Sequence, residues 1–143
     1  MYLRRTAKKM PNREILFRGK RKDNGEWVEG FAFEQHSPTE KEQWYIRSYE
    51  TDYNVDPNTV GQYTGKEDKN GVKIFKDDII KTKYGRLCQV VWFYSNAYNG
   101  WDLRPIGDVI HTRCPDEYDL WVSENLEVVG NIYDNPELIG IMG

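Results

Sequence analysis

The chain has 143 residues, a formal net charge of −3 and a pI of about 5.5. Hydrophobic residues make up 38% and charged residues 30%, a globular composition that excludes a disordered chain. No segment approaches the roughly 20 consecutive apolar residues of a membrane-spanning helix, and the acidic pI argues against a protein whose whole surface binds nucleic acid.

Aromatic residues reach 14%, from five Trp, ten Tyr and five Phe, and this bias favours β structure. Two cysteines, Cys88 and Cys114, are fewer than the disulfide framework of a small secreted domain needs. The basic first ten residues are not followed by the apolar segment of a secretory signal. We therefore expect a cytoplasmic protein with free thiols.

The first part of the chain predicts an extension and a small set of strands. Residues 1–11 form a basic extension that is either a solvated tail or an arm that touches nucleic acid. Three strands are expected, at residues 14–18, 27–33 and 43–49. A turn at 23–25 joins the first two strands, and Gly30 marks a bulge or a close backbone approach. Residues 34–42 read as a loop, and residues 52–58 as turn-rich because Pro57 disfavours a central strand.

The second part of the chain predicts further strands and one short helix. After a polar turn at 66–71, the short apolar segment 72–75 is followed by Lys76-Asp77-Asp78, which we expect to step out to solvent. Further strands are expected at residues 79–83, 87–94, 101–104, 120–122 and 127–133. The strand 87–94 is nearly apolar on both faces, which predicts a central position in its sheet. Residues 106–116 read as a long loop.

The last residues predict a short C-terminal helix. Asn135 is a good helix cap, Pro136 suits the first helical position, and Gly140 ends the turn. Helical periodicity is otherwise almost absent, so the fold class is mainly β.

Three blocks carry a resemblance to a known family: NREILFRG near the start, TVGQYTGKEDKNGVKIFKDDII in the middle and LEVVGNIYDNPELI at the end. In order and spacing they resemble the YopX family of bacteriophage and prophage proteins, over roughly residues 12–139. The resemblance implies an SH3-like small barrel in the C-terminal part, joined to a smaller N-terminal β sheet or hairpin portion. It also implies phage or prophage origin and a cytoplasmic site of action. The family has no known function, so the resemblance supplies no catalytic residue.

The same resemblance divides the chain into a basic extension at 1–11, an N-terminal β portion at 12–60, and a barrel with the short helix at 61–143. Lys76-Asp77-Asp78 stands where the family usually has Glu-Gly-Asp, which suggests that this step does not need a positive φ. Gly19-Lys20 replaces the usual Ala-Trp. The motif residues have a structural interpretation as turn and packing positions; they are Tyr63, Gly65, Asp68, Gly71 and Asp78.

Few residues offer chemistry. Asp77 and Asp78 could recruit a divalent metal or transfer protons, but neighbours on a strand point to opposite faces, so a solvated turn is the better interpretation. The soft metal ligands lack the close pairing of zinc sites; they are His36, His111, Cys88 and Cys114. No phosphate-binding loop has the required spacing. We therefore expect no catalytic residues, no metal and no cofactor.

The aromatic residues around the hairpin at 87–104 are the remaining candidates. The candidate interaction surface comprises Trp92, Tyr94, Tyr98 and Trp101. Exposed, these side chains could stack bases or grip a peptide; buried, they are core or a subunit interface. A modest basic rim is expected from Lys81, Lys83, Arg86 and Arg104.

Three classes of function follow, in this order. The first is a non-catalytic accessory protein that binds a host or phage protein or a second copy of itself. The second is a nucleic-acid-associated small barrel, which the acidic pI disfavours. The third is an enzyme of unknown class, which a pocket collecting Asp78, His111 and Cys114 would revive. No membrane partner is expected.

Overall fold

A computed structural model describes residues 14–96, 99–107 and 123–140. In these ranges the chain forms antiparallel β-strands joined by turns and short 3-10 segments, which confirms the mainly β prediction. The strands are β1 Phe17–Lys20, β2 Trp27–Ser37, β3 Glu40–Ser48, β4 Thr51–Val55, β5 Gly61–Glu67, β6 Lys73–Phe75, β7 Asp78–Thr82, β8 Leu87–Tyr94, β9 Asn99–Pro105 and β10 Leu126–Asn131.

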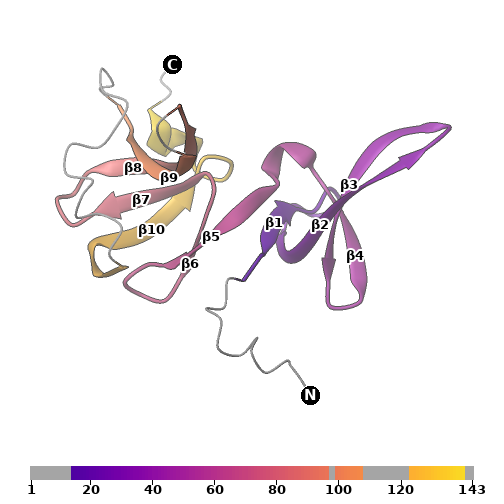
Figure 1. Cartoon of the computed structure of the whole chain (residues 1–143), viewed down its shortest axis with the longest axis horizontal. Helices are drawn as coiled ribbons and strands as arrows, with labels where there is room; N and C mark the ends of the chain where they lie inside the picture. Colours follow the sequence, from indigo (N-terminus) through magenta and orange to yellow (C-terminus); the bar gives the residue numbers. More distant parts are fainter. Residues whose placement is uncertain (1–13, 97–98, 108–122, 141–143) are drawn as a thin grey trace.

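The strands make a six-stranded sheet in the order β4-β3-β2-β1-β5-β6 and a four-stranded sheet in the order β10-β7-β8-β9. Figure 1 shows them as two lobes, with β5 running from one toward the other. The start of β5 pairs with β1 through Gly61 and Gln62, whereas its later part pairs with β6 through Tyr63 and Glu67. One continuous strand therefore carries the chain from the first lobe to the second.

Several local predictions for the first sheet are confirmed. Gly25 and Gly71 adopt φ values of 75° and 81° in the predicted turns. A Cβ on Gly30 would lie 2.0 Å from the carbonyl oxygen of Arg47, so this glycine marks the predicted close approach of backbones.

Two predictions for the same sheet are wrong. The expected loop 34–42 is mostly strand, because β2 and β3 continue as a hairpin around the turn at Pro38 and Thr39. Residues 51–55 form β4, which pairs with β3 from Trp44 to Ser48. Pro57 does not prevent this strand because it stands after it, in the 3-10 segment Pro57–Thr59.

The main apolar core lies under the second sheet. Its fully buried members are Ile74, Ile80, Cys88, Val90, Leu103 and Leu126. β8 lies between β7 and β9, as its apolar sequence predicted. The chain therefore places its most apolar strand inside the four-stranded sheet.

Two finer predictions need correction. The four-stranded sheet ends at β10 and β9, and the described strands do not close into a barrel. The predicted C-terminal helix is only the 3-10 segment Pro136–Ile139. Asn135 does not cap it, since its Oδ1 accepts instead from the backbone N of Asn131 at 3.2 Å. Gly140 is the C-cap of the segment, with a φ of 61° in the left-handed region.

Some predictions fall outside the described residues: the extension at 1–11, most of the loop 106–116, the strand 120–122, and the residues Tyr98, His111 and Cys114. In the described part of the chain, no helix is both long and apolar enough to cross a membrane. The division into 1–11, 12–60 and 61–143 stays a prediction.

Candidate functional site

The aromatic end of the β8–β9 hairpin is the candidate interaction surface. Trp92 lies directly across the strand pair from Trp101, with ring centroids 5.1 Å apart and an interplanar angle of 87°. Trp92 is 50% exposed and Tyr94 is 78% exposed. Three of the four predicted residues are thus brought together, and Tyr98 lies outside the described residues.

The exposure of these rings follows from how far β8 extends beyond the core. Side chains two apart on a strand share a face, so Trp92 and Tyr94 continue the face that carries Cys88 and Val90. Cys88 and Val90 are fully buried, whereas the two aromatics are not. Trp101 is partly buried and packs against the core cluster, so it anchors the exposed Trp92 to the folded sheet.

A groove of about 290 Å³ borders the same Trp101. Its other lining residues come from the segment before β1 and from β5; they are Glu14, Ile15, Gln62, Tyr63, Thr64 and Gly65. Ile15 is 73% exposed. The groove therefore extends the candidate interaction surface from the four-stranded sheet to β5 of the six-stranded sheet. Glu14 is the one charged residue in its lining.

The basic residues expected around this hairpin lie mainly elsewhere. Arg104 pairs with Gln89, and Lys81 pairs with Leu87, both positions that alternate with the Trp92 face. The Arg104 guanidinium also donates to Gln89 Oε1 at 3.2 Å. Arg104 and Lys81 are therefore on the sheet face opposite the aromatic rings.

The Asp77-Asp78 pair, expected in solvent, is buried between the two sheets. Asp78 is 1% exposed; its Oδ1 pairs with Arg18 Nη2 at 2.9 Å, and its Oδ2 accepts from the backbone N of Phe75 at 2.8 Å. The Arg18 guanidinium lies 4.4 Å from the Trp27 ring centroid. Burial raises the pKa of Asp78 to about 6, although the charge of Arg18 acts in the opposite direction. The prediction of a solvated step is wrong because β1 supplies a buried cation.

Asp77 corrects a second expectation. Its φ is 71°, so the position does need the left-handed region, which Asp tolerates better than most residues. Its carboxylate accepts from Tyr133 Oη at 2.7 Å and from Gln89 Nε2 at 2.9 Å. Burial opposes ionisation, but the hydrogen bonds from Tyr133, Lys76 and Gln89 outweigh it and lower the pKa of Asp77.

A third aspartate ties the sheets together at the far end of β10. Asp134 accepts from Lys20 Nζ at 2.6 Å and from Trp27 Nε1 at 2.8 Å. Partial burial is outweighed by these bonds and one from Asn131, which lower the pKa of Asp134 to about 2. We call Arg18, Asp77, Asp78, Tyr133 and Asp134 the polar junction.

The motif residues of the middle block build turns and packing, as predicted. Asp68 is buried and accepts from the backbone N of Asn70, Val72 and Val128 at 2.8 to 2.9 Å. Gly65 has a φ of 90°, and Tyr63 packs on Phe75 with centroids 5.5 Å apart. These side chains are therefore used within the fold.

The position of Asp78 gives no support to catalysis. It lines a cavity of about 370 Å³ together with Arg18, Glu29 and Lys73. Both of its oxygens already have partners, in Arg18 and the backbone N of Phe75. His111 and Cys114, the other two residues of the catalytic pocket considered from the sequence, lie outside the described residues.

The architecture agrees with the comparison to known families. The family model described as YopX protein matches residues 16–140. The chain belongs to the YopX family. Its members are uncharacterised proteins, so membership names a lineage and no reaction. The middle block of this YopX chain supplies the Asp68 turn and the Asp77-Asp78 corner.

The chain was also compared with solved structures and with curated proteins. A similar solved structure is the crystal structure of protein EF1440 from Enterococcus faecalis, with 21% sequence identity and a TM-score of 0.47. The match covers 90% of this YopX chain and 99% of that chain. No curated protein matches the chain.

Sequence reasoning missed part of the candidate site. Ile15 and Tyr63 join the groove beside Trp101 although they are far from it in sequence. Strand patterns locate the elements but not the pairing of distant ones, so no local signal marked these residues.

Proposed function

We propose that the protein is a phage- or prophage-encoded accessory protein that binds another protein, from host or phage, or a second copy of itself, without catalysis. The aromatic surface, defined as Trp92, Tyr94, Trp101 and Ile15, is the binding surface of this proposal. The observation that carries it is the exposure of Trp92 and Tyr94, 50% and 78%, on a strand whose other half is core.

The chemistry of this surface suits a protein partner. Tyr and Trp on a rigid strand provide large contact areas at low entropic cost, and they are enriched in protein interfaces. The neighbouring groove of about 290 Å³ can receive a side chain from the partner. Glu14 in that groove favours a basic or neutral group there.

Origin, location and the finer fold description belong to the same proposal. Phage or prophage origin and a cytoplasmic site of action rest on YopX membership and on the expectations from composition. The relation of the four-stranded sheet to SH3-like barrels rests on the same resemblance.

Nucleic-acid binding is the second candidate, because exposed rings such as Trp92 and Tyr94 can stack on bases. It ranks below the first since Arg104 and Lys81 lie on the other sheet face, away from the rings. Phosphates held by those residues would be separated from bases held by the aromatics.

The test compares a double variant, Trp92→Ala with Tyr94→Ala, with the matched control Tyr84→Ala. Tyr84 is also an exposed aromatic, at 60%, but it lies at the opposite end of β8. Sedimentation measures self-association, and crosslinking with capture from infected cells measures binding of a defined partner. Fluorescence anisotropy with labelled single-stranded DNA and RNA at low and moderate salt measures nucleic-acid binding.

The proposal expects a self-contact or a specific protein complex that the wild type and Tyr84→Ala form and the double variant loses. Salt-dependent nucleic-acid binding that the double variant loses would replace it with the second candidate. An interaction that the double variant keeps in full would remove the aromatic surface from either role.

A further inference from the structure

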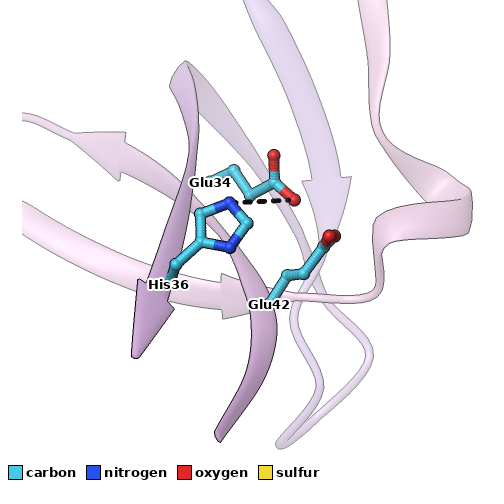
Figure 2. A group of neighbouring side chains, drawn as sticks. All are labelled: Glu34, His36 and Glu42. Atoms are coloured by element: carbon cyan, nitrogen blue, oxygen red, sulfur yellow. Dashed lines mark ion pairs between the residues drawn. The ribbon is translucent and has the colours of Figure 1, made fainter. Parts of the chain in front are cut away.

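Three side chains with metal-binding atoms meet on the β2–β3 hairpin, away from the aromatic surface. They are Glu34 and His36 on β2 and Glu42 on β3, shown in Figure 2. One ligand atom from each lies within 4.8 Å of the others. All three are reachable from solvent, so an ion needs no opening of the fold to enter.

The register of the hairpin explains why they meet. Glu34 and His36 are two apart on one strand and therefore share a face. Gln35 pairs with Gln43, which brings Glu42 to the same part of the hairpin. The third residue, Glu42, comes from the other strand. The spacing of residues in the sequence therefore did not indicate that the three side chains meet.

The charges of the group are unbalanced. His36 Nε2 lies 3.6 Å from Glu34 Oε2. Glu42 lies close to both, since one ligand atom from each of the three side chains lies within 4.8 Å of the others. Among the side chains that the structure describes, no Lys or Arg forms an ion pair with either glutamate. Two carboxylates therefore converge beside an imidazole, and no described Lys or Arg side chain neutralises them through an ion pair.

We propose that Glu34, His36 and Glu42 bind a divalent first-row transition metal ion of the Zn²⁺ class. Imidazole nitrogen suits Zn²⁺ and its neighbours in the series better than Mg²⁺ or Ca²⁺, and the two carboxylates supply the compensating charge. Three protein ligands leave at least one coordination position for water or for a group from another molecule. The donor set is mixed, which distinguishes it from an acidic surface patch.

The geometry sets the strength of the site. Without an ion, the three ligand atoms lie within 4.8 Å of one another. Zn–N and Zn–O bonds of about 2.0–2.2 Å would bring them closer together than that distance. The exposed glutamates must turn inward, and ordering them costs conformational entropy. Binding in the micromolar range is therefore expected, weaker than in a buried four-ligand site.

The position on the hairpin gives the ion a structural effect. β4 pairs with β3 only from Trp44 onward, so no other described strand pairs with the end of the hairpin that carries Glu42. Figure 1 shows this end of β2 and β3 projecting from the first lobe. An ion that bridges the two strands would hold them together, so Zn²⁺ should raise the thermal midpoint of the wild type.

The test titrates ZnCl₂ into the tag-free full chain by calorimetry, with MgCl₂ and CaCl₂ as comparison. His36→Ala and Glu42→Gln should each weaken Zn²⁺ binding at least tenfold. Gln35→Ala is the matched control, since Gln35 is exposed on the same strand between Glu34 and His36 but points to the opposite face. Substoichiometric Co²⁺ or Mn²⁺ should broaden the His36 ring signals in NMR spectra before those of His111.

The variants change exposed side chains, and circular dichroism checks that they fold. Equal Zn²⁺ affinity in His36→Ala and the wild type overturns the proposal. Loss of binding in His111→Ala or Cys114→Ser, with binding kept in His36→Ala, overturns it as well and moves the site. Equal affinity for Ca²⁺ and Zn²⁺ would contradict the assigned metal class.

Discussion

Two regions of this molecule reverse the usual relation between polarity and burial. At the corner before β7, Asp77 and Asp78 are only 5% and 1% exposed. At the end of β8, Trp92 and Tyr94 are 50% and 78% exposed. The carboxylates lie inside, between the two sheets, and the large aromatic rings lie outside.

The difference lies in the partners that each region finds within the chain. The buried carboxylates have partners for their charge and hydrogen bonds: Arg18 for Asp78, and Tyr133 with Gln89 for Asp77. Along β8, Cys88 and Val90 are buried, but Trp92 and Tyr94 are not. Part of the apolar area of these two rings therefore stays in water. The exposed rings are the basis of the interaction that we propose, whereas the buried charges, with their partners inside the chain, belong to the architecture.

The strongest way to break this comparison is to remove Asp78. Asp78→Ala leaves the Arg18 guanidinium buried without its counter-ion, and an unpaired buried charge costs about 3–5 kcal/mol. Urea unfolding at pH 7 should show a loss of that size. Tyr84→Ala, an exposed change, serves as the control. A loss below about 1 kcal/mol would mean that Arg18 finds another partner and that the polar junction is not essential.

The pH dependence of stability sharpens the same point. The pKa of Asp78 rises from 3.8 to about 6 on folding. Between these two pH values the native state keeps a proton on Asp78 that the unfolded state releases. Its contribution to stability is therefore full below about pH 4 and is lost as the pH rises through 6, by at most about 3 kcal/mol.

Asp134 acts in a separate window and with the opposite sign. Its pKa falls from 3.8 to about 2 on folding, so its contribution is present above about pH 4 and is lost as the pH falls toward 2.

The raised pKa of Asp78 can be tested with Asp78→Asn, which cannot titrate. The free energy of unfolding at pH 4.5 and at pH 7 should differ more for the wild type than for this variant. Equal pH slopes in the two proteins would contradict the raised pKa.

Asp77→Gly tests the corner at a smaller scale. Glycine accepts the φ of 71° more easily, but Tyr133 and Gln89 lose their acceptor. The lost hydrogen bonds should outweigh the backbone gain and leave a net destabilisation of about 1–2 kcal/mol. Asp77→Asn keeps an acceptor and a residue that tolerates the same φ, so its loss should be smaller. A more stable Asp77→Gly would show that backbone conformation dominates here.

The smallest effect on stability is expected on the aromatic surface. Tyr94→Ala removes a side chain that is 78% exposed, so denaturant unfolding should change by no more than about 0.5 kcal/mol. The same change should weaken whatever contact the surface makes, measured as in the sedimentation and capture experiments. If the free energy of unfolding fell by more than about 1.5 kcal/mol, Tyr94 would be a structural residue. The end of β8 would then not differ from the Asp77-Asp78 corner in this respect.

Part of the candidate site could be predicted from the sequence, and part could not. The alternation along residues 87–94 placed Trp92 and Tyr94 on one face, and the hairpin turn placed Trp101 across from them, as observed. Their exposure could not be predicted, since it depends on where the core ends beneath the strand. Arg104 was expected beside the rings, but its face follows from its pairing with Gln89.

The sequence by itself determined the mainly β class, the central place of β8, the turns at Gly25 and Gly71, and membership of the YopX family. These depend on local periodicity, backbone preferences and residue identity, which are present in any short stretch. Only the tertiary structure decided that Asp78 is buried against Arg18, that Asp77 needs a positive φ, and that Glu34, His36 and Glu42 meet. Each of these depends on contacts between strands or sheets, and the register that makes them is a property of the whole fold.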